Sequence, residues 1–457
     1  MKANNWFQFL LATLLVGGTV AFATDVPLVP PSRNHTPRMS FIENRSIRLG
    51  VDLNLGGAIT YLAPATNREL NVINSHDWGR QVQLSYYSGP SPFHPPGTVI
   101  STNWQSLGWN PIQSGDCFGF KSTMLKHSNT GHRLYTKLVP MQWPMQNVPG
   151  ECECEVWLQL DGPVVKARCR LTNHRSDHTQ YTGRSRELPA VYVNAPFHRL
   201  MTYRGGQPFT GGALSQVEAR LDLDKHWAYW LATENWAAQV NDAGWGLGVW
   251  NPAAVQFCGG FYKQPGVGGP LDDPTGYIAP LRTEILDHNV IYDYRYELIL
   301  GSLEEIRAHV YRRAAKPAPP AFRFQHDRQG WHYLGAADTG WPIRGELDVR
   351  LNGVTLQLIS PHLFTLAEDA PKLVLEAAFI NLSTNAVVFW RPLDGKEFSS
   401  EQSQPFAIVP DGKFRRYEIN LASSAGWRGA IARLRLDFDP AGRKDARARL
   451  KVVALAK

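Results

Sequence analysis

Short runs in which apolar and polar residues alternate recur along this chain, and they constrain its fold more than any other feature. Clear examples lie at residues 47–53, 156–160, 164–171 and 245–250, with Gly, Pro, Asn and Asp residues between the runs. A period of two is typical of β-strands that bury one face, whereas amphipathic helices repeat about every 3.6 residues. Helical periodicity is scarce, so the sequence predicts an all-β protein.

The N-terminus is typical of a secretory signal peptide. Lys2 is followed by a short apolar run and by Ala-Phe-Ala at residues 21–23, a small-x-small cleavage site. A membrane anchor is the alternative, but the run is interrupted by glycines and is shorter than the roughly 20 residues that a spanning helix needs. We therefore expect cleavage of residues 1–23, a secreted or periplasmic protein, and no membrane association afterwards.

The rest of the chain is expected to form two β domains. Ser302-Leu-Glu-Glu305 is a capping box, which predicts the start of a helix. Residues 316–321 form a proline-rich connector, which favours an extended and fairly stiff path. We place the boundary there, between a large β domain at residues 24–315 and a smaller β-sandwich at residues 322–457.

The charge of the chain is mildly basic. The formal net charge is +7, and it becomes +6 when Lys2 is removed with the leader. Basic residues are spread along the chain, and the densest cluster, at residues 443–451, alternates as on the solvent face of a strand. No nucleic-acid-binding motif accompanies it, so we expect no nucleic-acid partner. An acidic polymer such as a uronate or sulfated glycan would suit this charge.

Five cysteines leave at least one thiol unpaired in a monomer. An Asp161-Gly162 turn would make a hairpin that places Cys154 opposite Cys169, where a disulfide is geometrically possible. Buried free thiols are the equally open alternative. A zinc site at Cys152 and Cys154 is not expected, because no second Cys or His pair follows at zinc-site spacing.

Four segments, at residues 56–62, 170–177, 277–280 and 297–301, resemble the galactose-mutarotase-like β-supersandwich superfamily. The resemblance covers roughly residues 40–315. It implies a supersandwich of two large, curved antiparallel sheets with carbohydrate bound on a concave face. The superfamily also includes domains of glycoside hydrolases and polysaccharide lyases, and a fold alone does not decide between these activities.

Two departures from the mutarotase pattern predict a different activity. Residues 187–193 read Glu-Leu-Pro-Ala-Val-Tyr-Val where that family has a histidine pattern, and residues 277–280 read Tyr-Ile-Ala-Pro where its glutamate base would lie.

The C-terminal domain, with Trp390 and residues 427–437, resembles the jelly-roll carbohydrate-binding modules of many secreted glycan-active proteins. The chain is thus expected to act on carbohydrate without being a simple mutarotase.

Hydrolysis of a glycosidic bond usually requires two carboxyl groups, one protonated as acid and one ionised as nucleophile or base. Glu187 and Glu234 are the leading candidates. Glu187 follows Arg184 and Arg186, and a nearby arginine would keep its carboxyl ionised, although a surface ion pair is the alternative. Glu234 stands close to Trp236, whose ring would pack on a sugar unless it belongs to the core.

The stretch at residues 74–87 combines ionisable, amide and aromatic side chains. If its strand begins at Arg80, then His76, Asp77 and Arg80 converge at the mouth of a cleft. Arg80 would bind a carboxylate or a pair of hydroxyls of the substrate. His76 would transfer a proton near neutral pH, with Asp77 beside it as a further catalytic group. A His-Asp pair that only caps a turn is the alternative. The full set expected to bind substrate is Arg80, Gln83, Trp109, Asn110, Trp236 and His288.

Three functional hypotheses follow. The first is a secreted glycoside hydrolase that cleaves a polysaccharide or oligosaccharide, the second a non-catalytic carbohydrate-binding protein, and the third a polysaccharide lyase. A lyase would need a base such as His76 or Tyr192 and an Arg, Asn or Gln that neutralises a uronate carboxyl. No cofactor or catalytic metal is expected, although residues 272–276, which read first as a turn, leave structural calcium as an alternative.

Overall fold

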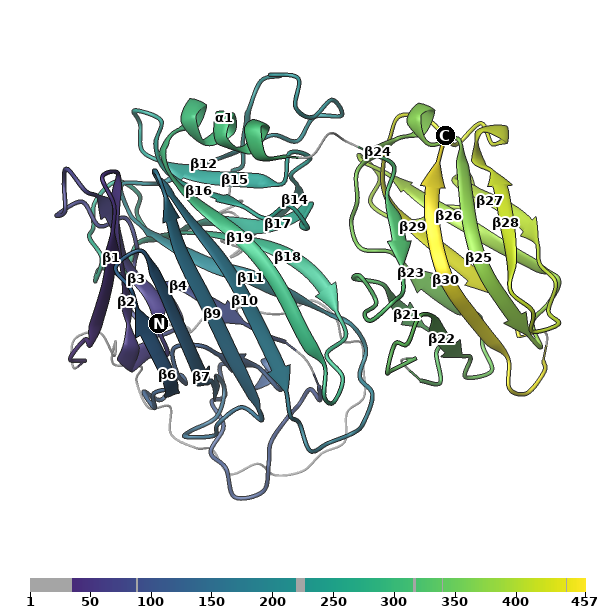
Figure 1. Ribbon diagram of the computed structural model, residues 1–457, viewed down its shortest axis with the longest axis horizontal. Coiled ribbons are helices and arrows are strands. Elements are labelled where there is room, and N and C mark those ends of the chain that lie inside the picture. The colour runs from purple at the N-terminus through teal and green to yellow at the C-terminus, as the bar shows by residue number, and fades with distance from the viewer. Residues whose placement is uncertain (1–34, 88, 219–226, 315–317, 339, 441) are drawn as a thin grey trace.

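The chain folds almost entirely into antiparallel β-strands, which confirms the predicted all-β class. The computed structural model describes residues 35–457 except 88, 219–226, 315–317, 339 and 441. The leader expected at residues 1–23 and the start of the expected connector lie outside the described residues. Two bodies of β structure lie side by side, one formed by residues up to 314 and the other by residues from 321 onward (Figure 1).

Two large sheets make up the N-terminal domain. The ten-stranded sheet contains, in spatial order, β1 (Met39–Glu43), β2 (Ile47–Asp52), β3 (Ala58–Pro64), β4 (Val82–Ser85), β11 (Arg184–Asn194), β18 (Thr275–Glu284), β17 (Gln256–Tyr262) and β14 (Trp227–Leu231), and β5 (Pro111–Ile112) links β4 to β8 (Met141–Gln142). The nine-stranded sheet contains β13 (Ser215–Gln216), β12 (Arg199–Thr202), β15 (Trp236–Val240), β16 (Trp245–Trp250), β19 (Ile291–Ser302), β10 (Val164–Asn173), β9 (Cys152–Asp161), β7 (Arg133–Val139) and β6 (Thr123–Asn129).

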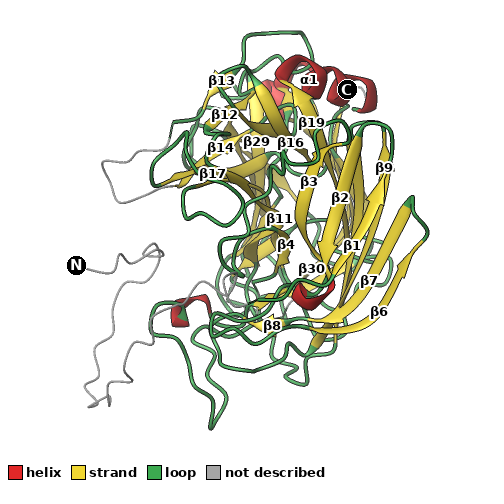
Figure 2. Cartoon of the chain, turned by 90° about the vertical axis from the view of Figure 1, so that its left-hand side faces the viewer, coloured by secondary structure: helices red, strands yellow, loops and turns green. Residues whose placement is uncertain are grey.

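These two sheets share one hydrophobic core. Buried side chains from both, among them Leu49, Val191, Leu158 and Leu298, form a continuous cluster. Each fully buried side chain of this size contributes about 1.5–3 kcal/mol. Figure 2 shows β6, β7 and β9 along one side of the domain and β14 and β17 on the other. Because side chains alternate along a strand, the residues between the core positions point to the outer faces of the sheets.

The one α-helix of the described residues, α1 (Leu303–Arg313), begins at the predicted capping box. The Ser302 hydroxyl accepts a hydrogen bond from the Glu305 backbone N–H at 3.2 Å, and the Glu305 carboxylate accepts one from the Ser302 N–H at 2.8 Å. Ile306 and Val310 are buried in a small cluster with residues of the nine-stranded sheet. Across the described ranges, no helix has the length and apolar character needed to cross a membrane.

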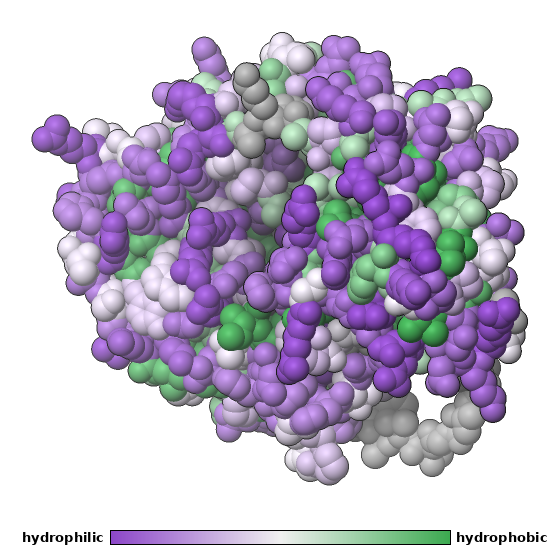
Figure 3. All heavy atoms as spheres, turned by 45° about the vertical axis from the view of Figure 1, so that its right-hand side comes forward, coloured by the Kyte–Doolittle hydropathy of each residue, from purple (hydrophilic) through white to green (hydrophobic). Residues whose placement is uncertain are grey.

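A second pair of sheets forms the C-terminal domain around its own core, which includes Leu358, Phe379, Trp390 and Leu436. The five-stranded sheet contains β20 (Ala321–Arg323), β30 (Arg447–Ala456), β25 (Lys372–Ile380), β28 (Arg415–Asn420) and β22 (Leu347–Arg350). The six-stranded sheet contains β21 (His332–Leu334), β23 (Leu356–Ile359), β29 (Ala430–Phe438), β26 (Asn385–Pro392), β27 (Ser403–Ala407) and β24 (Thr365–Leu366). Hydrophilic side chains dominate the face of the molecule in Figure 3, with hydrophobic residues scattered among them.

A buried ion pair joins the two domains. Asp287 precedes β19 of the N-terminal domain, and its Oδ2 lies 2.6 Å from Nη1 of Arg328, which precedes β21 of the C-terminal domain. Both side chains are 3% exposed. Nε of Arg328 also donates a hydrogen bond to the Tyr333 hydroxyl at 2.7 Å. The carboxylate and the guanidinium therefore stabilise each other's charge inside the interface.

The hairpin of β9 and β10 has a different register from the predicted one. Its two-residue turn is Gly162-Pro163, one position later than expected, and Cys154 pairs with Leu171 instead of Cys169. Gly162 has a φ of 55°, a left-handed conformation that glycine adopts at no steric cost. The expected opposition of the two cysteines is therefore wrong, and all five cysteines are buried free thiols.

The register leads to a first prediction. When the purified, unreduced protein is unfolded in denaturant, a thiol reagent should titrate all five cysteines, which have no bonded partner in the fold. A parallel sample treated with reductant should give the same count. A lower count before reduction than after it would contradict this register.

The interdomain ion pair leads to a second prediction. Asp287→Ala should lower the free energy of unfolding by about 3–5 kcal/mol, because it removes the carboxylate that lies 2.6 Å from the buried guanidinium of Arg328. Urea denaturation followed by tryptophan fluorescence measures this loss. Asp411→Ala is the matched control, since it breaks an exposed ion pair with Arg415 and should have little effect. Equal midpoints for Asp287→Ala and wild type would contradict the prediction.

Candidate functional site

A cavity of about 450 Å³ opens on the outer face of the ten-stranded sheet. Side chains of β4, β11, β14, β17 and β18 line it, together with the loops that contain His76 and Trp104. Aromatic rings dominate its wall: Trp78, Trp104, Trp143, Trp227, Tyr87, Tyr192, Tyr229, Tyr262 and Tyr277. Rings of this kind pack on the apolar faces of sugars, while their polar atoms bind hydroxyls.

Glu187 projects into this cavity from the centre of the sheet. It lies on β11 opposite Ser85 of β4 on one side and Leu281 of β18 on the other. The next residue, Leu188, belongs to the core, as alternation along a strand requires. Oε1 of Glu187 is 3.4 Å from the hydroxyl of Tyr87. The structure thus places this predicted residue in an aromatic cavity, and its catalytic role stays a prediction.

The pKa of Glu187 is raised. Burial of the carboxyl is the main cause, and the nearby hydroxyls of Tyr277, Tyr87 and Ser85 oppose the shift only in part. Of these hydroxyls, that of Tyr87 alone is at hydrogen-bond distance. A buried carboxyl with few donors holds its proton at higher pH than an exposed one, so the environment favours the neutral acid.

This direction corrects the expectation that an arginine keeps Glu187 ionised. Arg186 points to the opposite side of β11, where its Nη1 donates to the backbone carbonyl of Glu284 at 2.5 Å. Nη1 of Arg184 donates to the backbone carbonyl of Leu107 at 3.3 Å. Alternation places Arg186 and Glu187 on opposite faces of the sheet, so adjacency in sequence does not produce an ion pair.

Several polar atoms of the cavity wall have no partner. The hydroxyls of Ser85 and Tyr277 are buried beside Glu187 and form no hydrogen bond within the described part of the chain. The indole N–H groups of Trp78 and Trp104 are in the same condition. Buried polar groups in folded proteins are almost always paired. These four groups are therefore hydrogen-bond donors that the described part of the chain leaves unsatisfied at the cavity wall.

The loop at the cavity mouth brings His76, Asp77 and Arg80 together, but they bind other parts of the protein. Nε of Arg80 lies 3.1 Å from Oδ2 of Asp77, and its Nη2 lies 2.7 Å from Oδ1 of Asp273. Burial would lower the pKa of Arg80, but the two carboxylates raise it overall. Nδ1 of His76 is 3.0 Å from the Leu271 carbonyl oxygen. Arg80 is thus already neutralised, which weakens its expected role in gripping a substrate carboxylate.

The other substrate-binding residues predicted near this loop divide into two groups. Gln83 lines the cavity, and its Oε1 accepts a hydrogen bond from Oγ of Ser114 at 2.7 Å. Trp109 and Asn110 are fully buried and do not line the cavity. Trp109 belongs to the core between the sheets. Only Gln83 of these three lines the cavity, and its side chain is buried and bonded within the protein.

Asp116 also lines the cavity, where it organises a loop. Burial raises its pKa to about 6, although backbone N–H groups of Phe120, Asn147 and Phe118 act in the opposite direction. Oδ1 accepts from the N–H groups of Phe118 and Phe120 at 2.9 Å each, and Oδ2 accepts from that of Asn147 at 2.7 Å. Both oxygens are therefore occupied in holding the loop.

Glu234 lies outside the cavity, in a cluster with helix α1. Its carboxylate accepts hydrogen bonds from Arg307 Nη2 at 2.9 Å, Tyr311 at 2.7 Å and Trp236 Nε1 at 3.0 Å. Burial opposes its ionisation, but these donors lower its pKa overall. Trp236 is fully buried, as the alternative for this residue predicted. The expected pairing of Glu234 with Glu187 across one cleft is absent, because Glu234 lies in the turn between β14 and β15 and its carboxylate is bonded to side chains of helix α1.

His288 lies outside the cavity as well. Its Nδ1 is 2.5 Å from the Arg175 carbonyl oxygen, and its ring stacks on that of His178 with the centroids 3.7 Å apart. His288 is therefore not among the residues that line the cavity around Glu187.

The carboxylates considered for calcium are bound within the protein. Oδ2 of Asp272 accepts a hydrogen bond from the Gly269 N–H at 2.7 Å. Asp273 forms ion pairs with Arg80 and Lys263. No group of three or more His, Cys, Asp or Glu residues is arranged to hold a metal ion in the described ranges. The carboxylates of both aspartates are thus occupied by hydrogen bonds or ion pairs with other residues of the protein.

Sequence reasoning missed much of the cavity wall. Trp227 and Tyr229 were not singled out, because their strand, β14, joins β17, β18 and β11 only through the sheet order. Tyr229 lies between apolar residues of β14, so the residue pattern did not mark it as exposed, although the structure leaves it 60% exposed. Long-range strand pairing therefore decides which aromatics form the wall.

The raised pKa of Glu187 leads to a third prediction. A folded-state pKa above the ordinary 4.5 stabilises the fold below that pH, and this contribution is lost as the pH rises through the raised value. Glu187→Gln cannot ionise, so its stability relative to wild type should increase between about pH 4 and about pH 8. Urea denaturation at both pH values measures the difference. Glu69→Gln, at an exposed site, should show no such trend, and a pH-independent difference for Glu187→Gln would contradict the assignment.

Comparison with known proteins finds no matching family model and no matching curated relative. Among solved structures, a galactose mutarotase-like protein from Lactobacillus casei is similar over 57% of this chain and 100% of its own, at 12% identity and a TM-score of 0.36. A galactose mutarotase related enzyme from Lactobacillus acidophilus is similar over 58% of this chain and 98% of its own, at 11% identity and a TM-score of 0.33. A low-affinity xylan-binding module from Roseburia intestinalis is similar over 30% of this chain and 95% of its own, at 13% identity and a TM-score of 0.21. These similarities are too low to carry an argument about function, which depends on the cavity itself.

Proposed function

We propose that the protein is a secreted carbohydrate-active enzyme that cleaves glycosidic bonds, with Glu187 as the proton donor. The observation that carries this proposal is a carboxyl with a raised pKa in the centre of an aromatic-walled cavity. A general acid must hold its proton near the working pH, and burial among apolar groups is a common way to achieve this. The signal-like N-terminus supports secretion.

Binding of the sugar would use the groups that the fold leaves unsatisfied. Trp227, Tyr229 and Tyr277 present ring surface to the cavity, and sugar rings have apolar faces that pack on such surfaces. The unpaired hydroxyls of Ser85 and Tyr277 would exchange hydrogen bonds with sugar hydroxyls beside Glu187. The glycosidic oxygen would then receive the Glu187 proton as the bond to the leaving sugar breaks.

Asp77 is the second carboxyl that we assign to the reaction, in place of Glu234. It lines the same cavity as Glu187, and both carboxylates add to the effect of burial in raising the pKa of Tyr192. Its ion pair with Arg80 holds the side chain at the mouth. Asp77 would serve as the carboxylate that activates water or attacks the sugar, the role complementary to that of the acid.

Non-catalytic carbohydrate binding is the second candidate. The hydrogen bonds and ion pairs that occupy the carboxylates of Asp77 and Asp116 favour it. Asp77 binds Arg80 and the Gly79 N–H, and Asp116 is held by three backbone N–H groups. A polysaccharide lyase has weaker support. Arg80 is the one arginine or lysine that lines the cavity in the described ranges, and Asp77 and Asp273 already neutralise it.

A fourth prediction tests Glu187. Mature protein is incubated with a panel of neutral and uronate-containing polysaccharides, and reducing ends are followed together with the absorbance of unsaturated uronate. Wild type should release reducing ends without that absorbance, and Glu187→Gln should reduce the rate about 10²- to 10⁴-fold, the usual contribution of a general acid. Glu69→Gln, at an exposed site of the same domain, should retain the wild-type rate.

Each other outcome excludes part of this proposal. Wild-type turnover by a folded Glu187→Gln variant would remove Glu187 from the acid role. Both signals together would indicate elimination. Retention of a polysaccharide by wild type without either signal would establish the non-catalytic alternative.

A further inference from the structure

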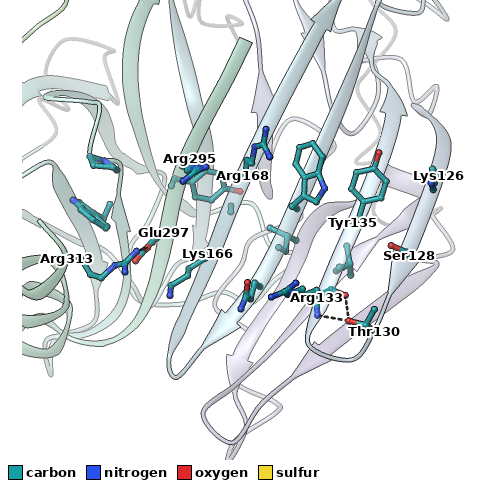
Figure 4. A pocket seen from close by; sticks show the side chains of 18 residues that line it. Lys126, Ser128, Thr130, Arg133, Tyr135, Lys166, Arg168, Arg295, Glu297 and Arg313 are labelled. Carbon is teal, nitrogen blue, oxygen red and sulfur yellow. Dashed lines mark hydrogen bonds and ion pairs between the residues drawn. The ribbon is translucent and has the colours of Figure 1, made fainter. Parts of the chain in front are cut away.

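A second concave surface lies on the outer face of the nine-stranded sheet. This groove has a volume of about 880 Å³ and crosses β6, β7, β9, β10 and β19, and Figure 4 shows its side chains. Six basic residues line it, at positions 126, 133, 166, 168, 295 and 313, against one acidic residue, Glu297. The groove and the Glu187 cavity are on different sheets, and the common core separates them. It is therefore a separate site.

The register of the sheet places five groove residues in one row. Ser128 pairs with Tyr135, Tyr135 with Trp157, Trp157 with Arg168, and Arg168 with Arg295. Neighbouring strands are about 4.8 Å apart, so this row extends about 19 Å across the five strands. An extended polymer that lies across the strands would meet a polar end, two aromatic rings and two guanidinium groups in succession.

The charged end of this row is only partly neutralised. Arg168 and Arg295 face each other directly across β10 and β19, an arrangement that destabilises a sheet when no counterion is present. Nη2 of Arg168 reaches Oδ1 of Asp293 at 3.4 Å, but both oxygens of Asp293 also bind Arg170, at 3.0 and 2.9 Å. Within the described ranges, Arg295 has no ion-pair partner. An anion between the two arginines would relieve their repulsion.

In the adjacent row of the same sheet, the basic side chains are neutralised by acidic side chains of the same row. There Lys137 pairs with Glu155, Glu155 with Arg170 and Arg170 with Asp293, so opposite charges alternate across four strands. The row of Arg168 and Arg295 lacks this alternation. The difference between two neighbouring rows argues that the excess positive charge is a local feature of the groove and not of the whole sheet.

The aromatic part of the row suits a sugar ring. The rings of Tyr135 and Trp157 lie side by side, with centroids 5.3 Å apart and an angle of 39° between their planes. The guanidinium of Arg168 lies over the Trp157 ring at 4.8 Å from its centroid. This combination presents an apolar surface next to a planar donor fork, which matches a ring that carries a carboxylate or sulfate.

We propose that this groove binds an anionic polysaccharide, with Tyr135 and Trp157 under the sugar rings and Arg168 and Arg295 on their carboxylate or sulfate groups. The site would anchor the protein to an acidic glycan independently of the chemistry at Glu187. A polyanion of another class, such as single-stranded DNA, would share the charge but offers bases in place of saturated rings.

The test uses one neutral polymer and three anionic ones, of which dextran and dextran sulfate share the same backbone. Binding of the mature full-length protein to dextran, dextran sulfate, polygalacturonate and poly(dT) is measured by affinity electrophoresis or calorimetry. We expect binding to dextran sulfate, polygalacturonate or both, and none to dextran, with the two anionic arms distinguishing sulfate from carboxylate. Arg168→Gln/Arg295→Gln should weaken this binding roughly tenfold or more, and Trp157→Ala should weaken it as well.

A charge-matched control separates the groove from non-specific attraction. Arg428→Gln/Arg443→Gln removes the same charge from exposed sites of the C-terminal domain and should leave binding unchanged. Glu187→Gln should also bind as wild type does. Far-UV circular dichroism confirms that each variant is folded.

Four outcomes would overturn the proposal. They are the absence of binding to both anionic polysaccharides, an equal loss in the two arginine double variants, loss of binding in Glu187→Gln, and tighter binding of poly(dT) than of either polysaccharide.

Discussion

The rest of the structure depends on the face-to-face burial of two large antiparallel sheets in the N-terminal domain. When a strand is hydrogen-bonded to a neighbouring strand on each side, its side chains can point in only two directions. They point either into the core or away from it, on the outer face of the sheet. Leu188 and Val156 take the first direction, and Glu187 and Trp157 take the second. Glu187 and the five residues of the groove row owe their positions to that constraint.

The same constraint explains the chemistry of Glu187. Its sequence neighbour Arg186 is forced to the inner side of the sheet and bonds to backbone carbonyls, so it does not reach the carboxyl. The outer side offers aromatic rings and a few hydroxyls instead, and burial among them raises the pKa of Glu187. A position that looks like half of an ion pair in the sequence becomes a candidate proton donor in the fold.

The sequence predicted the features that depend on local patterns. Strand alternation, the capping box at Ser302 and the loop at residues 76–79 are all encoded within a few neighbouring residues, although the strand that follows this loop begins at Val82 and not at Arg80. Features that depend on register or sheet order were mostly missed. A shift of one residue in the turn at Gly162 moved Cys154 away from Cys169. The separation of Glu234 from Glu187 follows from the bonding of the turn that carries Glu234 to Arg307 and Tyr311 of helix α1, which no local pattern specifies.

The central claim is that the Glu187 carboxyl acts on a glycan bound in the aromatic cavity. A crystal structure of the Glu187→Gln variant soaked with an oligosaccharide that wild type cleaves tests it most directly, because this variant should bind the intact substrate without turnover. The account predicts a sugar packed on the ring of Trp227 or Tyr277, with a glycosidic oxygen within hydrogen-bond distance of the side chain at position 187. An intact oligosaccharide bound elsewhere on the protein, with the cavity free of sugar, would contradict the account.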